Sequence, residues 1–227
     1  MAKKIFITGT GTDVGKTFVS GLILKKLHDS GISCGYYKAA VSGNVRKDDG
    51  TLIPGDPLFV RTVSDIGQPL EEMCPYVYEN AVSPHLASQI EGNLVKLDVV
   101  LDGLNKAEEK YDYLTAEGSG GMICPIRFDD QKIFLEDLIK AGNFSCLVVA
   151  DAGLGTINYV GLTIAYMQSH EIPVKGIILN HYDPNDIMHR DNLKMCEYVT
   201  GIKVIACVKK DDQELDIDVK ILKSLFE

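Results

Sequence analysis

The sequence predicts an α/β fold with a mostly parallel central sheet and helices on both of its faces. Short apolar, β-branched segments recur along the chain, and segments long enough for helices separate them. Clusters of polar residues and glycines directly follow several of these segments, as they do where ligands bind at the ends of parallel strands. Since no repeat, low-complexity tract or linker divides the 227 residues, we expect a single α/β domain over residues 1–227.

Six segments are expected to form the strands. Residues 4–8 (KIFIT) and 34–38 (CGYYK) come first, and residues 113–117 (YLTAE) precede a glycine-rich stretch. Residues 146–151 (CLVVAD), 176–180 (GIILN) and 203–208 (KVIACV) are largely apolar, as expected for strands buried on both faces. Because crossovers between parallel strands are right-handed, the carboxyl ends of these strands should meet at one edge of the sheet.

Helices are expected between the strands. The first has apolar residues at helical spacing from Phe18 to Leu27 and stops before Gly31. Helical patterns follow over residues 56–63, 94–110, 133–142, 158–169 and 187–200. Residues 42–55 are polar and contain glycine and proline, so they predict a loop.

The composition excludes several classes of protein. A net charge of −9 argues against a nucleic-acid partner, because phosphate neutralisation needs a basic surface. The same charge is compatible with ATP, which a locally positive pocket can hold on an acidic protein. No apolar run approaches the roughly 18–20 residues of a membrane helix, and the N-terminus lacks a signal-peptide pattern, so we expect a cytoplasmic protein with no membrane partner. The six cysteines are scattered without a C-x-x-C pair and are expected to be buried apolar residues.

Residues 9–17 (GTGTDVGKT) lie between the first strand and the first helix, the position that a phosphate-binding loop requires. Glycines let several backbone N–H groups point at phosphates, and the helix N-terminus adds partial positive charge. Lys16 would reach the β- and γ-phosphates, and the Thr17 hydroxyl would bind Mg²⁺. A strict P-loop has glycine where this chain has Thr10, so a glycine-rich turn with an incidental Lys-Thr pair is the alternative interpretation.

Three further charged residues follow or end predicted elements. Lys38 ends the second strand, where it could stabilise charge on a transferred phosphoryl group, or could be a surface lysine. Asp56 lies at a loop-to-helix transition, where it could be an N-cap. Glu117 precedes Gly118-Ser119-Gly120-Gly121 and could bind a metal or belong to a flexible turn. The polar clusters at residues 9–17, 38–42, 117–121 and 180 each follow or end a predicted strand, so they are expected to converge at one edge of the sheet.

The string GTGTDVGKT resembles the variant P-loop of dethiobiotin synthetases, G-T-x-T-[DE]-V-G-K-T. Related partitioning ATPases usually carry a lysine at the position of Gly11. Further segments resemble the same family in chain order over roughly residues 4–182, namely KAAVSG from Lys38, VSPHLA from Val82, EGSGG from Glu117, GLGTIN from Gly153 and the strand-end Asn180.

The resemblance implies an Mg²⁺-dependent ligase on a P-loop fold. From 7,8-diaminopelargonate, CO₂ and ATP such an enzyme makes dethiobiotin, ADP and phosphate, through a carbamate and a carbamic-phosphoric anhydride. It also implies a homodimer in which the loop before residue 158 reaches the partner's substrate pocket. The residues so implicated, by role, are: catalytic Lys16 and Lys38; nucleotide-binding Thr12, Asp13, Val14, Gly15, Lys16, Thr17, Phe18, Asp56, Glu117, Gly118, Ser119, Gly120 and Asn180; substrate-binding Thr12, Lys38, Ser42, Gly155 and Asn158; and metal-binding Thr17, Asp56 and Glu117.

The chain also departs from the family pattern. The usual proline after the strand-end lysine is Ala39, and the I-P-x-L element that completes the family's adenine pocket is absent after residue 206, so we expect altered base recognition. The position near Asn192 that resembles a substrate-contacting tyrosine is not aromatic. Two rival functions remain, a partitioning-type nucleotide switch and a cobyrinate-type amidotransferase synthetase. The acidic-to-mixed tail argues against the first, and the lack of room for a glutaminase half argues against the second.

Overall fold

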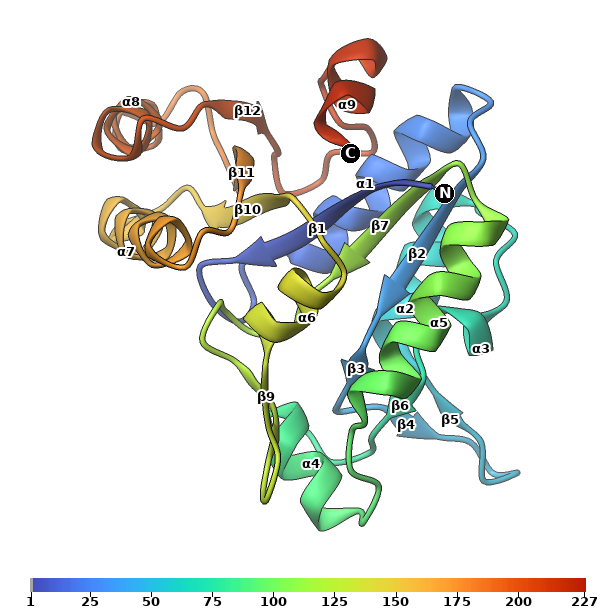
Figure 1. The fold of residues 1–227 in the computed structure, drawn as a ribbon. Coiled ribbons are helices and arrows are strands. Elements are labelled where there is room, and N and C mark those ends of the chain that lie inside the picture. The colour runs from blue at the N-terminus through green and yellow to red at the C-terminus, as the bar shows by residue number, and fades with distance from the viewer. Residues whose placement is uncertain (1) are drawn as a thin grey trace.

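The central sheet of the computed structural model, which describes residues 2–227, has six strands in the order β12-β11-β10-β1-β7-β2 (Figure 1). Every neighbouring pair in it is parallel. The strands are β1 (Lys3–Gly9), β2 (Cys34–Lys38), β7 (Tyr113–Glu117), β10 (Cys146–Asp151), β11 (Val174–Asn180) and β12 (Val204–Cys207). The predicted fold class is confirmed, and each predicted strand is present to within two residues at either end.

Helices cover both faces of the sheet (Figure 1). One face packs against α1 (Lys16–Asp29), α2 (Gly55–Ser64), the short α3 (Leu70–Met73) and α9 (Val219–Leu225). The other packs against α5 (Leu97–Lys110), α6 (Leu135–Ala141), α7 (Thr156–Ser169) and α8 (Ile187–Thr200). No helix among the described residues is both long and apolar enough to cross a bilayer.

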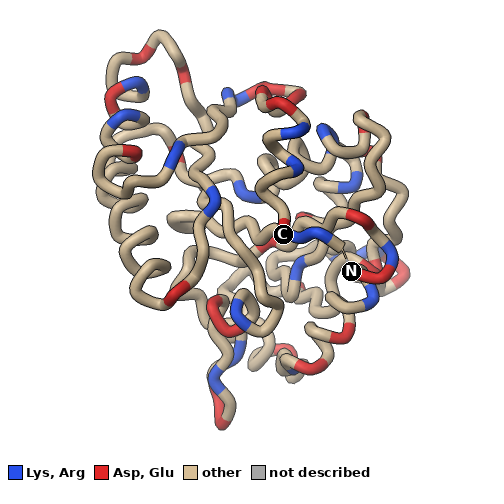
Figure 2. The backbone as a smooth tube through the Cα atoms, turned by 45° about the horizontal axis from the view of Figure 1, so that its top comes forward, with Lys and Arg blue, Asp and Glu red and all other residues tan. Residues whose placement is uncertain are grey.

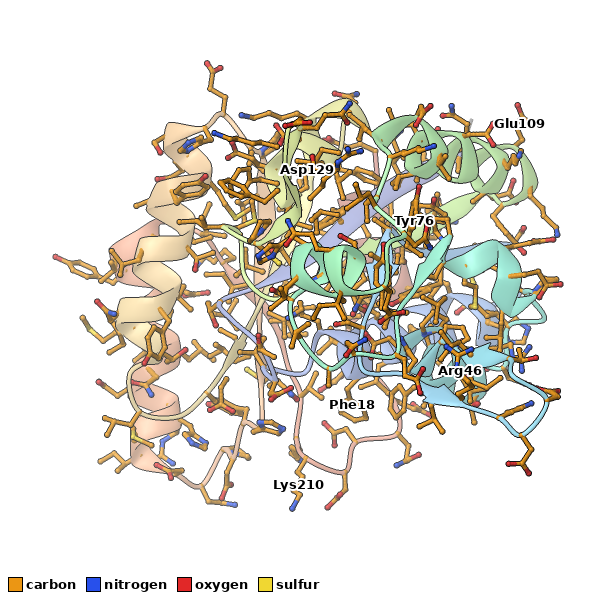
Figure 3. The ribbon with its side chains drawn as sticks, turned by 90° about the horizontal axis from the view of Figure 1, so that it is seen from below. Phe18, Arg46, Tyr76, Glu109, Asp129 and Lys210 are labelled. Atoms are coloured by element: carbon orange, nitrogen blue, oxygen red, sulfur yellow. The ribbon has the colours of Figure 1, made fainter. Side chains whose placement is uncertain are left out.

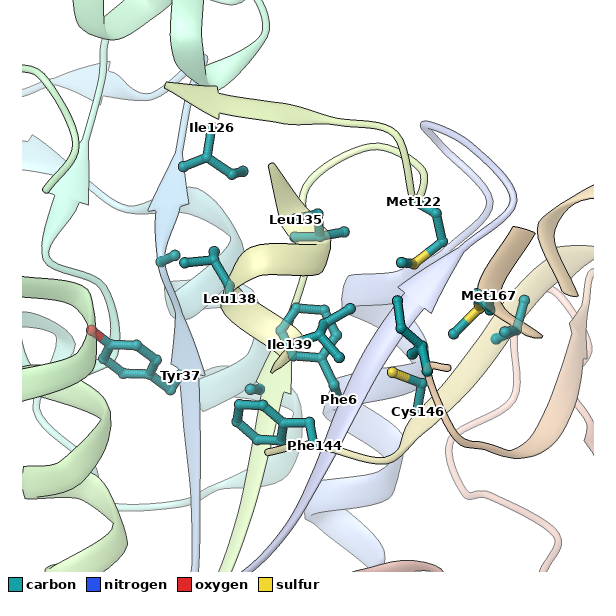
Figure 4. Close-up of a cluster of buried hydrophobic side chains, with 14 of the residues drawn as sticks. Phe6, Tyr37, Met122, Ile126, Leu135, Leu138, Ile139, Phe144, Cys146 and Met167 are labelled. Atoms are coloured by element: carbon teal, nitrogen blue, oxygen red, sulfur yellow. The ribbon is translucent and has the colours of Figure 1, made fainter. Parts of the chain in front are cut away.

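Alternating side chains of each strand divide between two hydrophobic clusters, because successive residues point to opposite faces of a sheet. In β2, Tyr36 packs with α1 and Tyr37 packs with α5. Figure 4 shows Tyr37 in the second of these clusters, with Phe6 and Phe144 nearby and its hydroxyl turned toward α5, where it donates to the Val100 carbonyl at 2.7 Å. Four of the six cysteines are buried in the described structure, and Cys124 and Cys207 are half-buried.

Several short elements were not predicted. The expected loop at residues 42–55 is wrong in part, because β4 (Val45–Arg46) and β5 (Leu52–Ile53) pair there as an antiparallel hairpin. β8 (Pro125–Phe128) pairs with β9 (Lys132–Phe134), and β3 (Ala40–Val41) pairs with β6 (Tyr76–Val77). α4 (Pro84–Ile90) packs against β8. Strands of two to four residues are too short to show a periodicity of two in the sequence.

Side chains bind the backbone of both edge strands. At β2 the buried Gln68 amide accepts from the Tyr36 N–H at 2.7 Å and donates to the Tyr36 carbonyl at 2.9 Å. At β12 the Glu197 carboxylate accepts from the Val204 N–H at 3.0 Å. Gln68 therefore fixes the middle of β2, the strand that ends in Lys38.

Truncation of Gln68 to alanine should lower the free energy of unfolding by about 2–4 kcal/mol, because two buried backbone groups of Tyr36 lose their partner. Urea unfolding followed by circular dichroism measures the change. Gln89→Ala is the matched control, since the exposed Gln89 amide makes one hydrogen bond, to the Phe128 carbonyl, and its loss should change the value by less than about 1 kcal/mol. Equal effects of the two substitutions would contradict this account of β2.

Candidate active site

The predicted functional segments lie where the parallel strands end. Residues 9–17 run from the last residue of β1 into the first turn of α1. Lys38 and Glu117 are the last residues of β2 and β7, and Asn180 is the last residue of β11. Figure 3 shows the molecule from below relative to Figure 1 and labels Phe18, which lies in the first turn of α1. The parallel register pairs Lys38 directly with Glu117, so their side chains point to the same face of the sheet.

The loop after β1 has the geometry of a phosphate-binding loop. Gly15 precedes α1 with φ at +93°, a conformation that glycine adopts without strain. The Lys16 side chain is only 7% exposed and folds back over the loop, where its Nζ donates to the Gly11 carbonyl at 2.7 Å. The first N–H groups of α1 are available to an anion at this point.

Lys38 and two carboxylates form a buried ion cluster next to this loop. The Lys38 ammonium donates to Asp56 Oδ2 at 2.5 Å and to Glu117 Oε1 at 2.7 Å. Lys38 is therefore not a surface lysine. Nor is Asp56 an N-cap, because Pro54 holds that position of α2 and Asp56 lies in the first turn. Glu117 is a strand residue with a fully buried side chain, which excludes the flexible-turn interpretation.

Glu117 also joins the cluster to α1. Its Oε1 accepts from the Thr17 hydroxyl at 2.8 Å, whereas its Oε2 is buried and has no hydrogen-bond partner in the described structure. Figure 2 shows that acidic and basic positions are interspersed along the described chain.

The two lysines have opposite pKa shifts. Burial, and then the positive charge of Lys38, lower the pKa of Lys16 to about 8, and the nearby carboxylates oppose this shift. Burial alone would also lower the pKa of Lys38, but the charges of Glu117 and Asp56 outweigh it and raise that pKa. The negative phosphates of a nucleotide would favour the charged form of Lys16, so the loop is suited to an anion.

The residues of the phosphate-binding loop and of the ion cluster line one cavity of about 470 Å³. Its walls come from the phosphate-binding loop, the end of β2, the start of α2 and the end of β7. The lining residues are Thr12, Asp13, Gly15, Lys16, Thr17, Lys38, Val41, Ser42, Asp56, Glu117, Ser119 and Gly120. All of them except Val41 were predicted from the sequence, and Val41 lies inside the segment KAAVSG that carried the prediction.

The family of the chain follows from its relatives. A model described as an AAA domain matches residues 3–214. A protein of Brachyspira hyodysenteriae named ATP-dependent dethiobiotin synthetase BioD is 50% identical over 100% of both chains. A Clostridium perfringens protein of the same name is 44% identical over 96% of both. The chain belongs to the dethiobiotin synthetase family.

Solved structures show how widely this fold is shared. The MinC:MinD cell division protein complex of Aquifex aeolicus contains a chain that matches with a TM-score of 0.57 at 13% identity, over 98% of this chain and 86% of that one. A ParA family ATPase from Chlorobium tepidum matches with a TM-score of 0.56 at 15% identity, over 93% of this chain and 86% of that one. At such identities the likeness concerns the fold alone.

Four residues implicated by the family pattern in nucleotide binding do not line the 470 Å³ cavity beside the phosphate-binding loop: Val14, Phe18, Gly118 and Asn180. Gly118 packs under Leu135 of α6, since an added Cβ would lie 2.7 Å from Leu135 Cδ2. Phe18 faces Phe59 of α2, with ring centroids 6.4 Å apart.

Asn180 lies against the phosphate-binding loop. Its Nδ2 donates to the Val14 carbonyl at 3.1 Å, and a Cβ on Gly15 would come within 2.0 Å of the same nitrogen. Asn180 is 1% exposed, and its Oδ1 has no partner in the described structure. The segment after β12 reaches the same region, because the Val208 N–H donates to the carbonyl of Leu179. Asn180 therefore supports the loop and offers a free acceptor beside it.

The predicted substrate residues divide into two places. Thr12, Lys38 and Ser42 line the cavity, whereas Gly155 and Asn158 are exposed at the start of α7. A second cavity, of about 480 Å³, shares Thr12 and Gly120 with the first. It has a mainly apolar wall formed by residues such as Met122, Ile123, Leu162 and Tyr166. These residues were missed, although Met122 and Ile123 directly follow the recognised segment EGSGG.

The site has a donor set that fits Mg²⁺. It offers the Thr17 hydroxyl, the Asp56 carboxylate and the Glu117 carboxylate, which are oxygen donors of the kind that Mg²⁺ prefers. Within residues 2–227 no group of three or more His, Cys, Asp or Glu side chains is arranged to hold a metal ion on its own. Two carboxylates that depend on a ligand's phosphates to complete the shell are typical of Mg²⁺ rather than of a structural metal.

Proposed function

We propose that the chain is an ATP-dependent dethiobiotin synthetase. It joins 7,8-diaminopelargonate and CO₂ at the cost of ATP, and it releases dethiobiotin, ADP and phosphate. The observation that carries this proposal is the single cavity in which Lys16, Lys38, Asp56 and Glu117 meet beside a phosphate-binding loop. The full-length likeness to proteins of that name supports the choice of substrates. We infer that the enzyme works in the cytoplasm, where ATP is available.

The two lysines act on the phosphates of ATP. Lys16 and the N–H groups at the start of α1 hold the β- and γ-phosphates. The carbamate of one substrate amine attacks the γ-phosphorus, the bond to ADP breaks, and a carbamic-phosphoric anhydride results. Lys38, which lines the same cavity, stabilises the negative charge that develops on the transferred group. The second amine then attacks the carbamoyl carbon, the ring closes, and phosphate leaves.

Thr17, Asp56 and Glu117 would hold Mg²⁺ next to the phosphates. An ion held by these three side chains would neutralise phosphate charge. Because Asp56 and Glu117 both contact the Lys38 ammonium in the described structure, the same carboxylates also keep this lysine oriented toward the cavity.

The substrate's amines and its chain need different surroundings. Thr12 and Ser42 line the same cavity as Lys38 and suit the amines and the carbamate, and the apolar second cavity suits the alkyl chain. We infer that Gly155 and Asn158 serve the substrate of a partner subunit in a homodimer. The exposure of Leu154, Tyr159 and Leu162, at 89%, 57% and 65%, supports this proposal, because large apolar side chains in one region commonly mark a protein interface.

Phosphate release is the decisive measurement. It should require 7,8-diaminopelargonate, bicarbonate and Mg²⁺ together, and dethiobiotin should form in equal amount. A panel of nucleoside triphosphates in the same assay measures base selectivity, which we expect to be relaxed because the family's I-P-x-L element is absent. Phosphate release that needs neither the diamine nor bicarbonate would contradict the proposed function and favour a nucleotide switch.

A further inference from the structure

Two buried polar atoms near the ion cluster have no hydrogen-bond partner among the described residues, the Tyr36 hydroxyl and Glu117 Oε2. Tyr36 is 0% exposed and Glu117 is 2% exposed. A buried hydroxyl or carboxylate oxygen without a partner lowers stability, so such atoms are rare in native proteins. The Tyr36 hydroxyl can donate a hydrogen bond and Glu117 Oε2 can accept one, so each could serve as the hydrogen-bond partner of the other.

The sheet places these two side chains next to each other. In the register of β2 with β7, Tyr36 pairs with Thr115 and Lys38 pairs with Glu117. Residues two apart on a strand share a face, so Tyr36, Lys38, Thr115 and Glu117 all point to the side covered by α1. Glu117 is thus the diagonal neighbour of Tyr36, at a separation that an aromatic side chain can span.

Tyr36 is held firmly in this place. Gln68 binds both its N–H and its carbonyl, and the ring packs in the same hydrophobic cluster as Val19 and Ile23 of α1 and Val60 of α2. Burial, followed by the negative charges of Glu117 and Asp56, raises the pKa of Tyr36 well above its ordinary value. The phenol therefore keeps its proton and can act only as a neutral donor or acceptor.

We propose that the Tyr36 hydroxyl donates to Glu117 Oε2 and is a positioning residue for the metal and for Lys38. The inference rests on the proposed function, because it assigns a use to the Glu117 carboxylate in that site. Glu117 Oε1 already accepts from Thr17 and Lys38. A hydrogen bond from Tyr36 to Oε2 would stop the carboxylate from rotating, so that Oε1 stays directed at Thr17 and Lys38 and the carboxylate is held ready for the metal. Partners of this kind orient metal-binding carboxylates in many proteins.

The test is Tyr36→Phe, which removes one atom and keeps the ring. Titration of Mg²⁺ into the full chain with ADP, followed by calorimetry, should show binding about 10-fold weaker than for the wild type. In the complete assay the KM for Mg-ATP should rise several-fold, and kcat should fall less. Binding of Mg²⁺ to the variant at wild-type affinity would overturn the inference.

Tyr37→Phe is the matched control. Tyr37 is the next residue of β2, is 3% exposed and donates to the Val100 carbonyl, but it points to the opposite face of the sheet. Its substitution should lower stability without changing the affinity for Mg²⁺. An equal loss of affinity in both variants would mean a general effect on β2 and would overturn the role of Tyr36.

The sign of the stability change is a second readout that does not depend on the metal. If the Tyr36 hydroxyl is bonded, Tyr36→Phe lowers the urea midpoint of the metal-free protein, and Glu117→Gln reduces that effect in a double-mutant cycle. If the hydroxyl has no partner, its removal raises the midpoint and the inference fails. Failure of the proposed function looks different, because phosphate release by the wild type would then need neither the diamine nor bicarbonate, whereas the effect of Tyr36→Phe on Mg²⁺ binding with ADP is measured without either of them.

Discussion

Replacement of Lys38 by alanine is expected to reduce kcat at least 100-fold, by analogy with the loss of one electrostatic stabiliser of a transition state. The KM for ATP should change much less, because the phosphate-binding loop and Lys16 remain. Steady-state phosphate release with saturating diamine and bicarbonate measures both constants. A kcat within about 3-fold of the wild type would remove Lys38 from the catalytic role.

The same substitution should also destabilise the metal-free protein. Glu117 and Asp56 lose the cation between them, and the loss of one partner from a buried charge cluster costs about 3–5 kcal/mol. We expect the lower end, about 3 kcal/mol, because the Asp56 side chain is 37% exposed and water screens it in part. Mg²⁺ with nucleotide should restore much of the loss. Lys106→Ala is the control, since the ion pair of Lys106 with Asp102 is exposed and lies on α5.

Gly15→Ala should abolish tight nucleotide binding and unfold the protein more easily. The residue has φ at +93°, and an added Cβ would meet Asn180 Nδ2 at 2.0 Å. Asn180 is buried and bonded to the Val14 carbonyl, so it cannot simply turn away. We expect a loss of about 3 kcal/mol from backbone strain and the broken hydrogen bond, and a fall in ATP affinity of about 100-fold from displacement of the loop. Urea unfolding and calorimetry measure the two effects.

The substitution Gly31→Ala separates the effect of backbone strain from the effect of a clash with Asn180. Gly31 also has a positive φ, at +72°, but an added Cβ there would have no atom within 4 Å, and the residue follows α1 far along the chain from the loop. The substitution Gly31→Ala should lower the free energy of unfolding by about 1 kcal/mol through backbone strain alone and leave ATP affinity unchanged. If Gly15→Ala behaved in the same way, the contact with Asn180 would have no part in holding the loop.

Much of this architecture could be predicted because its signals are local. The long strands appear in the sequence as apolar runs, and the helices appear as apolar residues at helical spacing. The segments around Lys16, Lys38 and Glu117 each contain a recognisable pattern next to a strand end. The rule that parallel strands end at one edge then places these segments near one another.

Other features depend on contacts between distant residues, which no local pattern reveals. Gln68 binds the backbone of Tyr36, 32 residues away, and Glu117 accepts from Thr17, 100 residues away. Asp56 could be a helix cap by its sequence alone, and only the structure shows that Pro54 is the N-cap of α2 and that Asp56 instead contacts Lys38, 18 residues away. Tyr36 was missed because a tyrosine in an apolar strand reads as a core residue, which it also is.

The two side chains bound to the margins of the sheet have a consequence for the behaviour of the protein at high concentration. A bare outer strand can recruit a strand from another molecule and start aggregation. Gln68 occupies both backbone groups of the central residue of β2, and Glu197 occupies an N–H at the start of β12. Each outer strand therefore lacks an uninterrupted row of free donors and acceptors, and this protects the folded enzyme from fibril-like association.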